Sequence, residues 1–254
     1  MKEKITLSLF GSGETIEGLK ASFANNKNFE TFKQSKNSDI CLVSDYRKRI
    51  DFFDNNSLWL NIHAGLLPKY RGFSSNSWAI LNNETEVGYT LHLLEYELDA
   101  GPIFYQKKFP IDLNEQYQNI RPKIISHIIS KTPQTCKNIF QNKIQPIKQD
   151  ESVARYCGKL KPEDGYFYNF SFSTQKIYNI FRIFAKPLGT GVYYIGKSEK
   201  YEITNILLPK NNIKYRGIEG VVVNKEGDVH WIKSEDSIVG IVFSNLNKKI
   251  GSRL

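Results

Sequence analysis

The sequence predicts an α/β domain followed by a small, mostly β domain. Short apolar strands alternate with helical or polar stretches in the first half, which is typical of a sheet with parallel strands. After residue 190 the chain becomes a series of short strands separated by Gly and Asn, a pattern typical of a small antiparallel barrel or sandwich. We therefore predict a first domain at 1–150, a linker and helix at 151–190, and the β domain at 191–254.

The first half begins with three predicted strands, each short and apolar. They cover residues 4–10, 37–45 and 57–64. The stretch "GSGETIEGLKASF" after the first strand reads as a glycine turn leading into a helix, with Thr15 as a candidate N-cap.

The next elements are a short helix in "SNSWAILNNE" and two strands that flank a loop at 95–102. A longer helix is predicted within 114–142, where apolar residues recur at spacings of three and four. Pro122 suits the start of this helix, and Pro133 predicts a break or a kink.

The second half opens with a predicted amphipathic helix in "SFSTQKIYNIFRIFA". Ile177, Ile180, Phe181 and Phe184 share one face of it. The stretches "GVYYIG", "YEITNILL", "GVVVNKEGDVHWI" and "SIVGIVFS" then predict the strands of the β domain.

Composition narrows the class of protein. The chain has 254 residues and a formal net charge of +9, spread without an arginine-rich arm, so an anionic ligand is favoured over nucleic acid. Three cysteines at wide spacings fit neither a disulfide framework nor a zinc site, and the four histidines lack metal-ligand spacing. Because no stretch reaches the length of a membrane span or a signal-peptide core, we expect a cytoplasmic protein with no membrane partner.

Three polar residues at strand ends form the candidate chemical site. Asn61 and His63 end the third predicted strand, and alternation places both on one face of the sheet. Asp99 lies in the turn between the next two strands. An imidazole can carry a proton near neutral pH, a carboxylate can orient it, and an amide N–H can donate to an oxyanion. Taken singly, each residue is more often a structural strand-end or turn residue than a functional one.

The stretches "NIHAGLLPKYRG" and "GYTLHLLEYELDAGPI" together resemble the signature of the 10-formyltetrahydrofolate-dependent formyltransferases, with 36 residues between His63 and Asp99. The resemblance implies a Rossmann-like formyltransferase domain, here with a shortened N-terminal half in which "ANNKNFETFKQSKN" replaces a strand–helix unit. It also implies that Asn61, His63 and Asp99 are the catalytic triad and that 10-formyltetrahydrofolate, with no metal, is the co-substrate.

The resemblance further implies two groups of binding residues. The folate is expected between two loops, one formed by Ser44, Asp45 and Tyr46 and the other by Glu95, Tyr96 and Glu97. The acceptor is expected at the basic turn, where Lys69 and Arg71 would meet a diphosphate and Tyr70 or Phe73 would pack on the sugar or base, next to Gly72.

Three branches of that family compete. The short chain and the "KPEDG" turn resemble enzymes that formylate nucleotide-linked amino sugars for bacterial surface polysaccharides such as O-antigen, with dTDP-4-amino-4,6-dideoxyglucose as the best candidate acceptor. Glycinamide ribonucleotide formyltransferases usually carry Pro-Gly where this chain has Arg71-Gly72. A methionyl-tRNA formyltransferase-like enzyme and a non-catalytic nucleotide-sugar-binding relative remain alternatives. A homodimer through the β domain is a further hypothesis.

Overall fold

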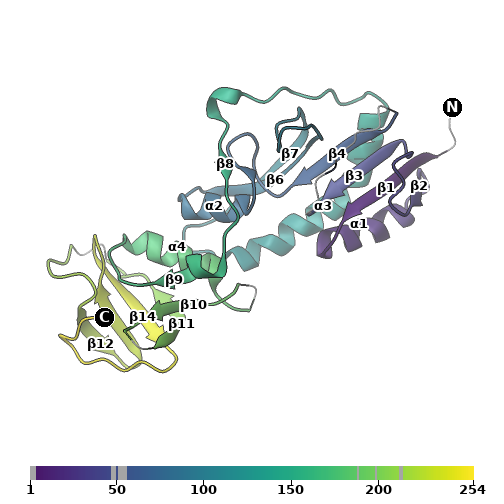
Figure 1. The fold of residues 1–254 in the computed structure, drawn as a ribbon. Coiled ribbons are helices and arrows are strands. Elements are labelled where there is room, and N and C mark those ends of the chain that lie inside the picture. Colours follow the sequence, from purple (N-terminus) through teal and green to yellow (C-terminus); the bar gives the residue numbers. More distant parts are fainter. Residues whose placement is uncertain (1–3, 47–49, 51–55, 188, 198, 212–213) are drawn as a thin grey trace. The chain divides into compact units, whose positions relative to one another are not determined.

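A computed structural model describes residues 4–46, 50, 56–187, 189–197, 199–211 and 214–254 (Figure 1). The chain forms two compact units. The first consists of Met1–Leu113 with Asn119–Lys159, and the second of Asn114–Gln118 with Leu160–Leu254. The domain boundaries at 150 and 190 stay predictions.

The first unit is built on a six-stranded sheet in the order β2-β1-β3-β4-β6-β7. Its strands are β1 (Ile5–Gly11), β2 (Phe29–Phe32), β3 (Ile40–Ser44), β4 (Leu58–His63), β6 (Glu86–Leu93) and β7 (Ile103–Pro110). The first four strands pair with one another in parallel, whereas β6 pairs antiparallel with both β4 and β7. The predicted α/β class is confirmed, and β2 is a strand that the sequence analysis missed.

The position of the short β2 explains how the N-terminal half of the sheet is connected with few residues. Parallel strands usually need a crossover of a dozen or more residues, because the chain must return to the start of the sheet. Here Phe32, the end of β2, pairs with Ser8, while Ile40, the start of β3, pairs with Leu7. β3 therefore starts at the height in the sheet at which β2 ends, with β1 between them. Residues 33–39 only have to pass from one side of β1 to the other, and they need not run back along a whole strand. The buried Ser8 hydroxyl accepts from the Ser35 N–H at 3.0 Å.

Helix α1 (Glu14–Ala24) follows a close approach between β1 and β3. At Gly11, which has φ of 143°, a Cβ would lie 1.8 Å from the Ser44 carbonyl oxygen, so only glycine fits. The N-cap of α1 is Gly13 rather than Thr15, which lies in the first turn. The predicted N-cap was wrong because the glycine turn itself carries the chain into the helix.

Helix α3 (Tyr117–Phe140) runs through both of its prolines without the break predicted at Pro133. A proline leaves the carbonyl four residues earlier, here that of Ile129, without its helical N–H donor. The Ser22 hydroxyl on α1 donates to the Ile129 carbonyl oxygen at 3.0 Å instead. A contact more than a hundred positions away in the sequence therefore supports the helix where the local signal predicts its end.

Replacing Ser22 by alanine should lower the free energy of unfolding by about 1 kcal/mol, because the Ile129 carbonyl then loses its donor. In a Pro133→Ala background the same replacement should cost less, since the restored backbone N–H can serve that carbonyl. Urea unfolding of the two single variants and the double variant measures this coupling. Equal costs in both backgrounds would contradict it.

The second unit combines helix α4 (Thr174–Phe184) with a sheet in the order β12-β13-β14-β11-β10-β9. Its strands are β9 (Tyr166–Phe167), β10 (Val192–Ile195), β11 (Lys200–Leu207), β12 (Val222–Glu226), β13 (Val229–Lys233) and β14 (Ile238–Phe243). All pair antiparallel except β9 with β10. The helix is capped by the Ser173 hydroxyl, and the four residues predicted to share its apolar face are all buried.

Strands β10 to β14 overlap the stretches where the sequence predicts strands, whereas β9 was not predicted. Their arrangement differs from the predicted barrel or sandwich. They form one open sheet with β12 and β9 at its edges. The remaining short elements of the chain are α2 (Ser75–Leu81), β5 (Arg71–Gly72), β8 (Tyr156–Cys157) and the 3₁₀ turns Glu151–Val153 and Pro162–Gly165. In the described part of the chain, no helix is long and apolar enough to span a bilayer.

Candidate active site

The three predicted catalytic side chains lie together at the end of β4. The Asp99 carboxylate contacts the other two side chains. Its Oδ2 is 3.2 Å from His63 Nδ1, and its Oδ1 accepts from Asn61 Nδ2 at 3.2 Å. The backbone N–H of Gly72 donates to Oδ2 at 2.8 Å. His63 and Asp99 are buried, whereas Asn61 is half-buried. The geometry suits a proton carrier and its carboxylate, and the catalytic roles of all three stay a prediction.

A fourth residue, His92 on β6, belongs to this cluster and was missed by the sequence analysis. It pairs with Asn61 across the antiparallel β4–β6 ladder and is fully buried. Its Nδ1 is 2.7 Å from the Leu93 carbonyl oxygen, and its Nε2 is 3.1 Å from Asn61 Nδ2. Nε2 also lies 3.5 Å from Asp99 Oδ1, so it can accept from Asn61 when it carries no proton or donate to Asp99 when it carries one. The only signal in the sequence is a histidine within an otherwise apolar strand that leads to Asp99.

His92 and Asp99 together fix the Asn61 side chain. The amide nitrogen of Asn61 carries two protons, and one acceptor lies in front of each, His92 Nε2 and Asp99 Oδ1. When His92 Nε2 carries no proton, both protons of the Asn61 amide are used within the protein. Donation to a substrate oxyanion, the role predicted for Asn61, requires this side chain to turn or to share a proton between two acceptors.

His63 is held by oxygen atoms on both sides. Its Nε2 is 2.6 Å from the Tyr70 carbonyl oxygen, and its Nδ1 faces Asp99. The charged imidazolium satisfies both contacts, whereas each neutral tautomer leaves one nitrogen lone pair facing an oxygen. Burial lowers the pKa of His63, and the charge of Asp99 opposes that change. The ring must leave the Tyr70 carbonyl before Nε2 can accept a substrate proton.

The pKa of Asp99 lies below its usual range. Burial alone would raise the pKa of this carboxyl, but contacts with His92 and His63 and the Gly72 N–H outweigh burial. Asp99 is thus a carboxylate at neutral pH, which is the form that can orient and charge-stabilise an imidazole.

The histidines predict how the stability of the protein depends on pH. Burial lowers the pKa values of His63, His127 and His230 below the usual 6.5. Below about pH 6.5 the unfolded chain binds more protons than the folded one, so the free energy of unfolding should fall as the pH falls. Urea midpoints measured between pH 7.5 and 5.5 should decrease, and a constant or rising midpoint would contradict this prediction.

The surroundings of Arg71 contradict its predicted role in binding a diphosphate. Its side chain has no exposed surface, and all five guanidinium N–H donors have partners within the protein. Nε and Nη2 donate to Gln149 Oε1, Nη1 and Nη2 to the Glu151 carboxylate, and Nη1 to the Tyr156 hydroxyl. Arg71 therefore cannot meet a phosphate. Instead it anchors β8, which pairs with β5.

The other residues of the basic turn differ in exposure. Lys69 is largely exposed and pairs with Glu84 at 3.1 Å, and Glu84 also accepts from the Tyr70 hydroxyl at 2.9 Å. Phe73 is exposed, and Gly72 serves Asp99 through its backbone. Lys69 is thus the cation of the turn that remains available to a ligand.

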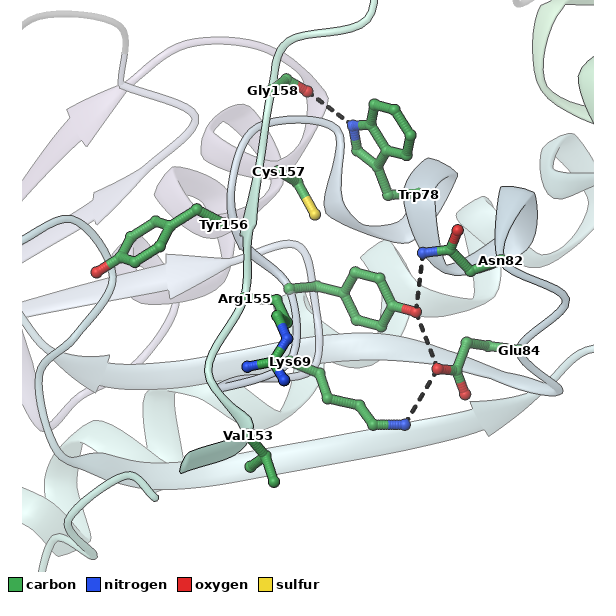
Figure 2. Close-up of a pocket in the computed structure, with 10 residues that line it drawn as sticks. Lys69, Trp78, Asn82, Glu84, Val153, Arg155, Tyr156, Cys157 and Gly158 are labelled. Atoms are coloured by element: carbon green, nitrogen blue, oxygen red, sulfur yellow. Dashed lines mark hydrogen bonds and ion pairs between the residues drawn. The ribbon is translucent and has the colours of Figure 1, made fainter. Parts of the chain in front are cut away.

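An open pocket of about 660 Å³ lies beside this turn (Figure 2). Figure 2 shows Trp78 and Asn82 of α2 on one side and the segment 153–158 on the other. The lining residues are Lys69, Tyr70, Trp78, Asn82, Glu84, Val153, Arg155, Tyr156, Cys157 and Gly158. Two cations and several rings make the pocket suited to an anionic ligand with a flat group.

The predicted folate loops approach each other over one apolar cluster. Phe10, Cys41, Val43 and Trp59 form this cluster, and Tyr46 from one loop and Leu94, next to the other, pack against it.

The other predicted folate residues differ in position. Ser44 is buried at the end of β3, Asp45 is exposed with φ of 49°, and Glu95 and Tyr96 are exposed. Glu97 accepts from the Tyr156 hydroxyl at 2.7 Å. Folate contacts at these positions stay predictions. Among the residues that the structure describes, no group of three side chains could hold a metal ion.

Comparison with known proteins finds a family that resembles the part of the chain holding this site. Residues 12–135 match the family described as Formyl transferase. The methionyl-tRNA formyltransferase of Thermotoga neapolitana is 30% identical over 69% of this chain and 57% of its own length. This chain spans between a third and three fifths of the length of the curated relatives it matches first, with 33%, 41% and 57% covered.

Solved structures show the same fold. WlaRD, a sugar 3N-formyl transferase crystallised with dTDP and 5-N-formyl-THF, has a TM-score of 0.73 at 20% identity, covering 96% of this chain and 99% of WlaRD. The N-formyltransferase from Helicobacter canadensis, in complex with folinic acid and dTDP-3-aminofucose, has a TM-score of 0.73 at 18% identity over 94% of this chain and 100% of that one.

Proposed function

We propose that this protein transfers a formyl group from 10-formyltetrahydrofolate to the amine of a nucleotide-linked amino sugar, because residues 12–135 match the family described as Formyl transferase. The observation that carries the proposal is the joining of Asn61, His63 and Asp99 at the end of β4. The preferred acceptor is dTDP-4-amino-4,6-dideoxyglucose, and the product would serve a bacterial surface polysaccharide such as O-antigen.

The proposed chemistry needs no nucleophile from the protein. The neutral amine of the acceptor attacks the formyl carbon, a new C–N bond forms, and the bond between that carbon and N10 of the folate breaks. The amine loses one proton and the departing N10 gains one, so the proton balance closes through His63. Asp99 stabilises the imidazolium during the transfer, and Asn61 donates to the oxyanion after turning from His92 or Asp99.

The folate is proposed to lie against the two loops that meet over the apolar cluster. A flat ring system packs favourably against aromatic side chains such as Tyr46. The loop that holds Glu95, Tyr96 and Glu97 ends at Asp99, so a folate bound there would bring its formyl group toward the catalytic side chains. The proposed reaction uses no metal ion.

The acceptor is proposed to use the open pocket. Tyr70 connects the pocket with the catalytic residues, because its backbone oxygen contacts His63 while its side chain lines the pocket. Lys69 and Arg155 supply the charges for a diphosphate, and the Trp78 ring offers a surface for a base or sugar. Two of the solved structures support this choice: WlaRD was crystallised with dTDP, and the Helicobacter canadensis enzyme is in complex with dTDP-3-aminofucose.

Replacing Lys69 by alanine should raise the KM for the nucleotide sugar about tenfold, because a charge-assisted contact to phosphate is lost. The KM for the folate should stay within about twofold, since Lys69 is not in the folate loops. Steady-state kinetics with each substrate varied in turn measures both values. An unchanged KM for the nucleotide sugar would contradict the proposal that the acceptor binds in this pocket.

A methionyl-tRNA acceptor is the second candidate, favoured by the curated relatives, which are methionyl-tRNA formyltransferases. The +9 charge is compatible with RNA but is spread along the chain. Release of tetrahydrofolate should be measured with four acceptors: dTDP-4-amino-4,6-dideoxyglucose, its 3-amino isomer, UDP-aminoarabinose and initiator methionyl-tRNA. Turnover with a nucleotide sugar alone supports the proposal, and turnover with the tRNA alone overturns it. Binding of a nucleotide sugar without turnover would instead favour the non-catalytic relative.

A further inference from the structure

The last residues of the predicted first domain return to the carboxylate of Asp99. Gln149 is buried, and its amide nitrogen donates one proton to the Asp99 carbonyl oxygen at 2.8 Å and the other to the Gly101 carbonyl oxygen at 2.7 Å. One side chain therefore holds the backbone on both sides of the turn that presents the Asp99 carboxylate.

Arg71 fixes the orientation of the Gln149 amide. Gln149 Oε1 accepts from Arg71 Nε at 3.1 Å and from Nη2 at 3.0 Å, so the oxygen faces the guanidinium and the nitrogen faces the two carbonyls. The Glu151 carboxylate takes the opposite edge of the same guanidinium in a two-point contact, which fixes its plane. A series of hydrogen bonds therefore links Glu151, through Arg71 and Gln149, to the backbone of Asp99.

Asp99 needs such support because of its backbone conformation. Its φ of 54° lies in the left-handed region, which a non-glycine residue adopts only when its surroundings hold it there. Gln149 holds the carbonyl of Asp99, and the Gly72 N–H, next to Arg71, holds its carboxylate. Two consecutive residues, Arg71 and Gly72, therefore restrain the backbone and the side chain of Asp99 together.

We propose that Gln149 is a positioning residue that acts through Asp99, keeping the carboxylate against His63 Nδ1 and Asn61 Nδ2. Gln149 contacts none of the reacting groups itself. Without its two donated hydrogen bonds, the turn relaxes from the left-handed conformation and the carboxylate moves away from His63. The inference rests on the proposed function for its kinetic consequence, but its structural consequence is measurable in the free protein.

The test is an NMR titration of the His63 ring in four proteins: wild type, Gln149→Met, Asp99→Asn and the double variant. Methionine keeps the length of the side chain and removes both donors. The charge of Asp99 raises the pKa of His63, so Asp99→Asn should shift the His63 titration to lower pH. Gln149→Met should shift it in the same direction by at least about half a pH unit, and the double variant should match Asp99→Asn alone.

Two further variants separate positioning from folding. Glu17→Gln removes an exposed charge outside this network, where Glu17 pairs with Lys20, and it should leave the His63 titration near that of wild type. Gln149→Leu also lacks both donors to Asp99 and Gly101 and adds no charge near His63, so it should reproduce the shift if Gln149→Met does not fold.

An unshifted His63 titration in a folded Gln149 variant, or a shift that adds fully to that of Asp99→Asn, overturns the inference. In the transfer assay, the same variants should lower kcat about tenfold or more and move the acidic limb of the pH profile with the His63 titration. If the titrations shift as expected but wild type transfers no formyl group, the proposed function fails and the positioning role stands.

Discussion

Replacing His63 by asparagine should lower kcat for formyl transfer about a thousandfold, because the site loses the group that carries the proton from the amine to the folate. Asparagine retains a polar group near Asp99 but has no titratable nitrogen. The nucleotide sugar should bind with an affinity within about threefold of wild type, since His63 does not line the pocket that holds the cations proposed to bind the diphosphate. Steady-state kinetics and calorimetric binding measure the two effects separately.

A matched control for this variant is His127→Asn. His127 is partly buried and stacks on Tyr105, with its Nδ1 at 2.9 Å from the Tyr89 hydroxyl, but it contacts none of the catalytic side chains. Its replacement should leave kcat within about twofold of wild type. Turnover of His63→Asn close to that of this control would show that the proton takes another route.

Replacing Arg71 by alanine should lower the free energy of unfolding by about 3 kcal/mol. The substitution deletes a fully buried side chain and leaves Gln149 Oε1 without both of its donors. The exposed Glu151 can turn to water, which limits the loss. Urea unfolding followed by circular dichroism measures the change.

The control for Arg71 is its neighbour in the same turn. Lys69→Ala removes an exposed ion pair with Glu84, which should cost no more than about 0.5 kcal/mol. A similar small cost for Arg71→Ala would contradict the structural role of Arg71. It would also reopen the diphosphate role that burial excludes.

Local sequence patterns were sufficient to predict the elements that position the site. The apolar strand ending in Asn61-x-His63, the hairpin that leads to Asp99, and helix α4 with its buried face all follow from short-range periodicity. The pairing of Asn61 with Asp99 was also within reach, because the family signature contains both. Each of these features depends on residues that are close in the sequence or fixed by one motif.

The remaining features depend on contacts between distant residues. Ser22 supports α3 at Pro133, and the register of β2 and β3 on β1 makes a crossover helix unnecessary. His92 meets Asn61 only because β6 pairs antiparallel with β4. None of these contacts leaves a local signature, so periodicity could not predict them.

Arg71 and Lys69 show the same difference at the level of single side chains. Both are basic residues in one turn, and the sequence predicts one role for both. Gln149 and Glu151, about 80 positions later, bury one of them and leave the other exposed. These two residues lie on either side of the predicted boundary between the first domain and the linker, where no sequence motif points to Arg71.

The central claim is that Asn61, His63 and Asp99 catalyse formyl transfer to a nucleotide sugar. The most direct measurement supplies 10-formyltetrahydrofolate labelled with ¹³C in its formyl group together with dTDP-4-amino-4,6-dideoxyglucose, and analyses the sugar by mass spectrometry. Wild type should produce a sugar that carries one labelled formyl group, and Asp99→Asn should produce almost none. A sugar left unlabelled by wild type, or labelled equally by both proteins, would contradict the account.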